Sequence, residues 1–358
     1  KGSGKGKEEG EWVTLKDGEA MGKRGVVVVS EEKRLWDILA LYLISQKLKQ
    51  IKTIPATIQC ADEKMLCPAL PGHIVKVQVL KRFNSRKLPH MIEVEMDTGE
   101  KRKFIFKEDD DISMDMTVMD LLRLCNKTWE KAGCEARIKT YTVVATANCS
   151  GFCECISGDT MLKYDAEALD NLLGSDAQKW RNFFTSLFAV ITTTAAFDIT
   201  DRHHNNVMFS PDGEVCLIDL SASLGFKAPM DSTLSINPVY FPDRFLKLRG
   251  YYVKRAAASG PEFEEKTGMS LIDWYKFEAM CMQAYYALFT DPVVRAHTAQ
   301  FQYDFPTPLK FLKYLTDRKD EGKNRSKEAI RNQIVTKMEE SDTVARMVAT
   351  ITSVIPMN

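Results

Sequence analysis

The chain has 358 residues, of which 44% are apolar, and its 49 lysine and arginine residues balance its 49 aspartate and glutamate residues. This length exceeds one ordinary small domain and suits two lobes, each with a sizeable apolar core. A balanced charge excludes attraction to nucleic acid or to membranes through bulk charge, so any membrane docking must be local.

The N-terminal region predicts little regular structure before one helix. Residues 1–24 are expected to be a flexible segment, because Lys1–Gly10 is rich in Gly, Lys and Glu and has no apolar period. The chain starts with Lys1 rather than Met, so we expect it to be part of a longer protein. The spacing of apolar residues in Glu31–Lys49 predicts an amphipathic helix. It would pack on the N-terminal lobe or, less favoured, on a domain outside this chain.

The next segments predict a sheet followed by a helix. His73–Lys81 and Met91–Lys107 alternate and are rich in Val and Ile, which is typical of antiparallel strands. A helix is predicted over Met116–Lys131, beginning near Asp115 and ending before Gly133. Asp115 would then lie at a helix N-terminus, where a carboxylate is favoured.

A second long helix is predicted further along the chain. Ser175–Gln178 reads as a capping box for a helix over Trp180–Phe197. Its segment Phe183–Phe197 is the longest apolar run, but it contains four threonines and a serine and suits a buried core helix. The apolar runs are too short to span a bilayer, and a secretory signal is not visible.

The nine cysteines indicate a reducing compartment. Cys149, Cys153 and Cys155 are close together but lie in an apolar strand without a second ligand cluster, so we interpret them as buried thiols rather than as a zinc site.

The segments Asp201–Met208 and Leu217–Asp219 form the most informative pattern. Ser210-Pro-Asp-Gly213 between them suits a type I turn, so Val207–Phe209 and Glu214–Ile218 are expected to be the arms of a hairpin. The hairpin would bring Asn206 and Asp219 together at its open end, beside Asp201 and His203. Two oxygen ligands with a second acid and a histidine suit a Mg²⁺-phosphate site. The alternative is a hairpin that merely has polar ends.

D-R-H-x-x-N followed by a hairpin and I-D resembles the phosphatidylinositol 3-/4-kinase superfamily. A second segment supports the resemblance. F-I-F-K ending at Lys107, followed by E-D-D-D-I-S-M-D-M, is similar to the family's F-K-x-G-D-D-L-R-Q-D-M. The resemblance puts Lys107 on the ATP phosphates and Asp110 and Asp115 on the two functional acids. Without the first motif, a solvated acidic loop after an edge strand would be the simpler interpretation.

Two further segments complete the resemblance. Tyr141–Ile156 is similar to the strand and hinge behind the adenine, with Glu154 and Ile156 at the hinge positions. Backbone groups read the adenine edge there, so side-chain identity is expected to be loosely constrained. Asn84–Pro89 matches the family's short phosphate loop, with Ser85 and Lys87 as candidate phosphate contacts. A basic turn on a solvated hairpin remains open for that loop.

The departures from the family pattern concern activity more than fold. D-F-G is replaced by Asp219-Leu-Ser221, and a serine restricts the backbone where glycine would not. Leu217 stands where the family has histidine, and Asp198 and Thr200 replace the glycines of G-x-G-D-R-H. An active divergent enzyme and a pseudokinase scaffold are both compatible with these changes. The retained phosphate- and metal-facing side chains favour activity.

The resemblance implies an α+β, two-lobed kinase-like fold, with an antiparallel-sheet N-lobe over residues 25–156 and a mainly helical C-lobe over residues 157–358. It implies ATP and Mg²⁺ as cofactors, with Lys107 on the phosphates and Asn206 and Asp219 on the metal. Asp201 or His203 would take or relay the proton of the attacking hydroxyl, and imidazole suits this role because it titrates near neutrality.

The implied substrate is a phosphatidylinositol lipid at a membrane surface, phosphorylated on its 3- or 4-hydroxyl. Ser221–Asn237 holds one basic residue, Lys227, which favours unphosphorylated phosphatidylinositol or a protein hydroxyl over polyphosphorylated lipids. A related protein Ser/Thr kinase is the nearest alternative. We expect a cytoplasmic protein peripheral at membranes, with regulatory domains or subunits outside this chain and no nucleic-acid partner.

Overall fold

The computed structural model of the chain describes twelve stretches of residues: 13–14, 19–21, 27–29, 41–60, 65–67, 70–84, 87–146, 149–202, 205–226, 261–262, 264–268 and 276–316. The chain divides into two compact units. Unit 1 comprises Lys1–Met116 and Tyr141–Cys155, and unit 2 comprises Thr117–Thr140 and Ile156–Asn358. The sequence predicted one boundary, after residue 156. In the structure, residues 117–140 also belong with the helical unit.

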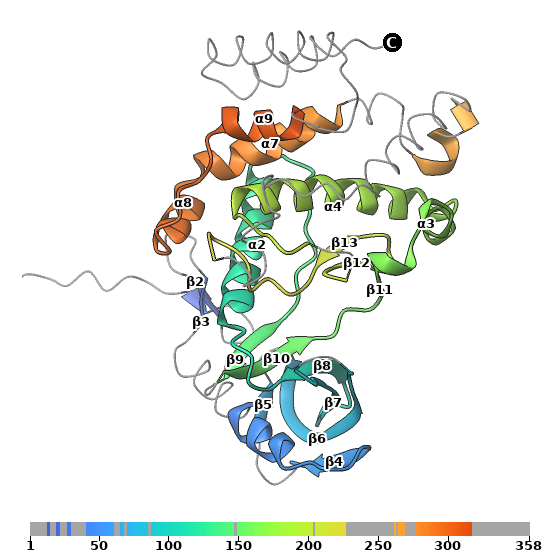
Figure 1. Cartoon of the computed structure of the whole chain (residues 1–358), viewed down its shortest axis with the longest axis vertical. Coiled ribbons are helices and arrows are strands. Elements are labelled where there is room, and N and C mark those ends of the chain that lie inside the picture. The colour runs from blue at the N-terminus through green and yellow to red at the C-terminus, as the bar shows by residue number, and fades with distance from the viewer. Residues whose placement is uncertain are drawn as a thin grey trace, which may run out of the picture. The chain divides into compact units, whose positions relative to one another are not determined.

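Unit 1 is built on a seven-stranded antiparallel sheet (Figure 1). Its order is β4-β6-β7-β8-β10-β9, and β5 also pairs with β6. The strands are β4 (Ala56–Gln59), β5 (Met65–Cys67), β6 (Leu70–Arg82), β7 (His90–Met96), β8 (Lys101–Lys107), β9 (Val143–Thr146) and β10 (Ser150–Glu154). A separate three-stranded sheet pairs β1 (Val13–Thr14), β2 (Glu19–Met21) and β3 (Val27–Val29).

The strand pattern of the sequence is confirmed with one correction. β6 covers the predicted strand, and side chains of β7 alternate between buried and half-buried, as a sheet with one covered face requires. Met91–Lys107, however, is not one strand. Gly99 adopts φ 83°, and its N–H donates to the carbonyl of Met96 at 2.9 Å, which makes a turn between β7 and β8. The Thr98-Gly99 signal for this turn was present in the sequence.

One face of the sheet is covered by the helix at residues 41–49. Leu41, Ile44 and Leu48 are buried in the same apolar cluster as Phe106 and Phe152 of the sheet. The described half of the predicted amphipathic helix therefore packs on unit 1, as the favoured interpretation held. The first half of that prediction, residues 31–40, lies outside the described residues.

Unit 2 is mainly helical (Figure 1). The helix α2 (Ser113–Lys131) begins in unit 1 and continues into unit 2. It is followed by η2 (Met161–Lys163), α3 (Ala166–Leu173), α4 (Ala177–Ala196), α7 (Phe277–Thr290), α8 (Pro292–Ala299) and α9 (Pro308–Thr316). Phe184 of α4 meets Phe277 of α7 edge to face at 5.6 Å between ring centroids, and Tyr285 stacks on Phe311 of α9 at 4.0 Å. These aromatic contacts join α4, α7 and α9 into one core.

The two predicted helices are present, and one predicted cap is wrong. Asp115 lies in the first turn of α2, and Gly133 adopts φ 64° just beyond its end, as expected. The N-cap of α4 is Asp176 rather than Ser175, because its carboxylate accepts the backbone N–H groups of Gln178 and Lys179. A carboxylate also suits the positive end of the helix dipole. Phe183 to Ala196 are buried, as predicted for a core helix.

The remaining strands of unit 2 form the sheet β11-β12-β13. β11 (Asp159–Thr160) pairs with β12 (Val207–Phe209), which pairs with β13 (Val215–Leu217) in the register Val207–Leu217 and Phe209–Val215. The turn is closed by the N–H of Gly213, which donates to the carbonyl of Ser210 at 3.0 Å. The hairpin predicted from the sequence is confirmed.

Candidate active site

A buried arginine organises the open end of the hairpin in unit 2. Arg202 is 2% exposed. Its Nε donates to the carbonyl of Thr200 at 2.7 Å and its Nη1 donates to the carbonyls of Asn206 and Ile218 at 3.3 and 2.7 Å. Its Nη2 donates to the carbonyl of Asp219. One guanidinium thus fastens Thr200 and Asn206 to the chain that leaves β13. The sequence interpretation quoted this arginine in D-R-H but gave it no role.

Asn206 and Asp219 are brought to one end of the hairpin, as expected. The N–H of Ile218 donates to the carbonyl of Asn206 at 3.1 Å, which extends the ladder by one bond beyond β12 and β13. Asn206 is 6% exposed, and its Nδ2 donates to the carbonyl of Asp201 at 2.9 Å. This bond fixes the orientation of the amide and leaves its oxygen as the end able to accept or to ligate. The predicted neighbour His203 lies outside the described residues.

The backbone at this end is unusual. Asp198, Asp201 and Asp219 adopt φ of 48°, 56° and 57°, in the left-handed region that non-glycine residues seldom enter. Such residues gather at functional sites, where the surrounding contacts hold them. Asp198 replaces the first glycine of the family pattern, and aspartate tolerates this conformation better than most residues. Ser221 is not among the residues of positive φ, so the expected restriction by that serine does not arise.

The donor set fits Mg²⁺ on its chemistry. The side chains of Asn206 and Asp219 supply an amide and a carboxylate oxygen, and a magnesium ion takes few protein ligands when phosphates provide the others. In the described part of the chain, no group of three or more His, Cys, Asp or Glu side chains is arranged to hold a metal ion. The zinc alternative therefore finds no support there. Cys153 is buried and Cys155 half-buried, but Cys149 is exposed at the turn before β10, contrary to expectation.

In unit 1, the ATP-phosphate candidates gather where β8 ends. Lys107 is the last residue of β8, and its Nζ lies 3.8 Å from Oδ2 of Asp110. Lys87, from the loop between β6 and β7, donates from Nζ to the carbonyl of Asp109. The candidate phosphate loop and the acidic loop are therefore in contact, a proximity that the sequence did not predict. Ser85 lies outside the described residues.

The two remaining acids of this loop differ in environment. Asp115 is 1% exposed in the first turn of α2. Asp111 accepts hydrogen bonds from the hydroxyl and the backbone N–H of Ser113, and these bonds lower the pKa of its carboxyl. Asp111, which the sequence interpretation did not single out, thus fixes the start of α2 and with it the position of Asp115.

The hinge candidates lie at the boundary of the units, which falls between Cys155 and Ile156. Oε1 of Glu154 accepts from Arg102 at 3.0 Å, and Oε2 accepts from the N–H of Thr142 at 2.9 Å. The Glu154 N–H donates in turn to the carbonyl of Thr142 at 2.7 Å. The carboxylate of Glu154 thus joins β8 to β10 and to the residue before β9, a structural role that the sequence interpretation did not assign to this side chain.

Comparison with known proteins agrees with this arrangement. Residues 101–171 match the model of the family described as phosphatidylinositol 3- and 4-kinase. This stretch contains Lys107, Asp110, Asp115, Glu154 and Ile156. Over this stretch the chain is similar to phosphatidylinositol 3- and 4-kinases, as a divergent domain of that kind would be. The pattern around Asp201 and Asp219 lies outside the matched stretch.

Individual relatives share low sequence identity with this chain. A phosphatidylinositol 3-kinase C2 domain-containing subunit gamma of Rattus norvegicus is 26% identical over 146 residues, 36% of this chain and 10% of the relative. A human phosphatidylinositol 4-phosphate 3-kinase C2 domain-containing subunit beta is 27% identical over 181 residues, 44% and 11% of the two chains. A phosphatidylinositol 3-kinase of Saccharomyces cerevisiae is 23% identical over 201 residues, 52% and 22%. The alignments thus cover less than a quarter of each relative's length.

Proposed function

We propose that the chain is an ATP-dependent kinase that phosphorylates the inositol ring of a phosphatidylinositol lipid on its 3- or 4-hydroxyl. The observation that carries the proposal is the bonding of Arg202, which fixes the backbone of Asn206 and Asp219 at one hairpin end. Similarity to a lipid kinase family gives the reaction class. Each residue's role is taken from the resemblance to the family's motifs, which occur in the same order as Lys107, Asp201, Asn206 and Asp219.

Mg-ATP supplies the phosphoryl group and the charge neutralisation that its transfer needs. In this chain Asn206 and Asp219 would hold the metal, and Lys107 would contact the phosphates. Lys87 and Ser85 would line the same phosphates, and the carbonyl of Glu154 and the backbone groups of Ile156 would face the adenine. Asp201 or His203 would take the proton from the inositol hydroxyl.

Asp110 and Asp115 have supporting roles in the proposal. Asp110 lies 3.8 Å from Lys107 and would hold the ammonium group where phosphates can reach it. Asp115, buried in the first turn of α2, would also help to hold the ammonium group of Lys107 in place. Neither residue would transfer a proton, since both are assigned to nucleotide binding and not to the attacking hydroxyl.

We further propose that the protein works in the cytoplasm, peripherally at a membrane surface that presents the lipid. In the described part of the chain, none of the helices is long and apolar enough to cross a membrane. The relatives are named phosphatidylinositol 3-kinases, which supports an inositol lipid as substrate. Regulatory domains or subunits outside this chain remain part of the proposal, and no nucleic-acid partner is expected from the balanced charge.

The proposal is tested with labelled ATP, Mg²⁺ and vesicles of phosphatidylinositol, with a panel of proteins as competing acceptors. A labelled phosphatidylinositol monophosphate is expected, and separation of its isomers assigns the hydroxyl. Label on a protein hydroxyl but on no inositide would contradict the lipid assignment. Absence of any transfer, together with absence of Mg-ATP binding, would favour the pseudokinase.

Substrate preference offers a second test. The single basic residue of Ser221–Asn237, Lys227, is expected to favour phosphatidylinositol over its bisphosphate. Ser232→Lys with Thr233→Lys should shift the preference toward phosphorylated lipids by roughly tenfold or more, because each basic residue near a membrane contributes about 1 kcal/mol. Unchanged preference with activity retained would show that the lipid is chosen elsewhere.

A further inference from the structure

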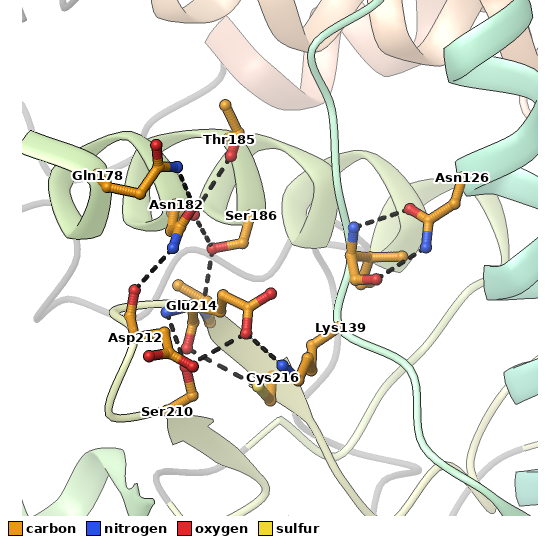
Figure 2. Close-up of polar contacts among 12 residues, drawn as sticks. Asn126, Lys139, Gln178, Asn182, Thr185, Ser186, Ser210, Asp212, Glu214 and Cys216 are labelled. Carbon is orange, nitrogen blue, oxygen red and sulfur yellow. Dashed lines mark hydrogen bonds and ion pairs between the residues drawn. The ribbon is translucent and has the colours of Figure 1, made fainter.

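The closed end of the β12–β13 hairpin is fastened to the rest of unit 2 at three places. Asn182 of α4 donates from Nδ2 to the carbonyl of Asp212 at 2.9 Å, and the hydroxyl of Ser186 accepts the N–H of Val215 at 2.8 Å. Nζ of Lys139 lies 2.5 Å from Oε2 of Glu214 (Figure 2). We call Lys139, Asn182, Ser186 and Glu214 the hairpin clasp.

The turn itself sits tightly on α4. A Cβ added to Gly213 would lie 2.6 Å from the carbonyl oxygen of Lys179, so backbone meets backbone there. Gln178 in turn donates from Nε2 to Oδ1 of Asn182 at 2.8 Å and fixes the amide that holds Asp212 (Figure 2). The position of the turn is therefore determined by α4 on one side and by Lys139 on the other.

A short lever connects the clasp to the metal candidates. Each strand of the hairpin has three residues, which is about 10 Å of extended chain. Val215 pairs with Phe209 next to the turn, and the bond from Ile218 to Asn206 closes the other end. Since these ladder bonds run without a break from the turn to the open end, we expect a displacement of the turn to reach Asn206 and Asp219.

The ion pair of the clasp is partly shielded from solvent. The exposed fractions of the Lys139 and Glu214 side chains are 37% and 25%. Burial acts to lower the pKa of Lys139, but the hydrogen bond from its ammonium to Glu214 and the charge of that carboxylate outweigh burial and raise it. Lys139 therefore stays charged through the neutral range. A cavity of about 360 Å³ borders the pair and is lined also by Arg137, Thr185 and Ser186.

We propose that Lys139 is a positioning residue for phosphoryl transfer, which through Glu214 holds the closed end of the hairpin so that Asn206 and Asp219 stay aligned at the open end. This inference rests on the proposed function, in which those two side chains hold Mg²⁺. Lys139 acts through the hairpin and contacts neither nucleotide nor lipid. Lys139 is the second-last residue of unit 2 before the chain enters unit 1 at Tyr141.

The test replaces Lys139 and compares it with a matched ion pair. Lys139→Met removes the charge, and Lys139→Arg keeps it. Arg181→Met is the control, because Arg181 lies 2.6 Å from Glu135 of the same segment but does not touch the hairpin. Lys139→Met should lower kcat and raise the Mg²⁺ concentration for half-maximal activity, each by roughly threefold to fivefold, the upper end of what one such ion pair contributes. KM for the lipid should not change.

Lys139→Arg and Arg181→Met should stay within about twofold of the unsubstituted protein in all three quantities. A Lys139→Met variant that matches Arg181→Met in kcat and Mg²⁺ dependence would overturn the proposal. So would a loss that merely follows the folded fraction, with the Mg²⁺ dependence unchanged, since that would assign Lys139 to stability alone.

Amide hydrogen exchange separates this proposal from the proposed function. Lys139→Met should speed exchange at Val215 and also at Ile218, whose N–H bonds to Asn206, whereas Arg181→Met should not. This pattern supports the hairpin lever even if the protein transfers no phosphate, in which case only the proposed function fails. Faster exchange at Val215 with unchanged exchange at Ile218 would show that the turn is loosened without reaching the metal candidates, and would overturn the inference.

Discussion

The nucleotide candidates of unit 1 and the metal candidates of unit 2 are held by different kinds of interaction. Around Lys107 and Lys87 the contacts are one ion pair and one side-chain bond to a carbonyl, at residues that remain partly exposed. Around Asn206 and Asp219 a buried arginine donates to four backbone carbonyls. The first group can adjust to a ligand at little cost, whereas the second is fixed by the fold.

This difference predicts where stability and activity separate. Partly exposed ion pairs contribute little to folding, with a typical value of 0–1 kcal/mol, so substitution of Lys107 or Lys87 should affect activity much more than stability. Buried carbonyls that lose a charged donor are costly, so substitution of the buried arginine should affect both.

The largest effect is expected for Arg202→Met. The buried carbonyl of Thr200 and the half-buried carbonyl of Ile218 would lose this donor, and each unsatisfied group costs about 1–3 kcal/mol, so the free energy of unfolding should fall by about 2 kcal/mol or more. Urea denaturation measures the change, with Arg181→Met as the exposed control. A loss below about 1 kcal/mol would mean that the guanidinium bonds are not what holds this end of the hairpin.

Lys107→Met should separate the two properties. Transfer should fall by roughly a hundredfold or more, because one preorganised donor to the transferring phosphate is lost, while unfolding free energy should change by less than about 1 kcal/mol. Lys101→Met is the matched control, since Lys101 lies on the same strand and pairs with Glu95 at 3.2 Å. Equal kinetics for the two variants would remove Lys107 from the proposed site.

Two glycines with the same backbone angle compare the units directly. Gly213 and Gly99 both have φ 83°, but a Cβ at Gly213 would meet the Lys179 carbonyl, whereas one at Gly99 would meet nothing within 4 Å. Gly213→Ala should therefore cost about 1–2 kcal/mol more than Gly99→Ala, which carries only the backbone strain of about 1 kcal/mol. Thermal or urea unfolding of both variants gives the difference. Equal costs would mean that the turn is not seated on α4.

The hairpin and most elements followed from sequence because turn chemistry and apolar period act locally. Ser210–Gly213 specified its turn, and the alternation in β7 specified a sheet face. The role of Arg202 did not follow, because its four acceptors are backbone carbonyls and leave no mark on side-chain pattern. The contact of Lys87 with Asp109 likewise joins two loops that are 22 residues apart. The Asp176 cap was missed because Ser175 beside it offers the same chemistry.

The smallest effect concerns pH and His90 of unit 1. Burial and then the charge of Arg82 lower the pKa of His90 below its usual 6.5. The unfolded state therefore binds a proton more readily than the native state. Above pH 6.5 His90 should therefore not lower the free energy of unfolding. As the pH drops from 6.5 through the lower native pKa, the free energy of unfolding should fall, because protonation favours the unfolded state. Urea midpoints at pH 7.5 and 5.5 should differ more for the unsubstituted chain than for His90→Asn. An equal difference would leave His90 without a part in the pH dependence.

The most direct test of the account is the change in melting temperature on addition of Mg-ATP, measured for the unsubstituted chain, Lys107→Met and Asp219→Asn. The account predicts a clear rise for the unsubstituted chain, because a ligand at a hundred times its Kd stabilises the native state by about 2.7 kcal/mol. It predicts a much smaller rise for both variants, since Lys107 would contact the phosphates and Asp219 would hold the metal. No rise at millimolar Mg-ATP, or the same rise in all three proteins, would contradict it.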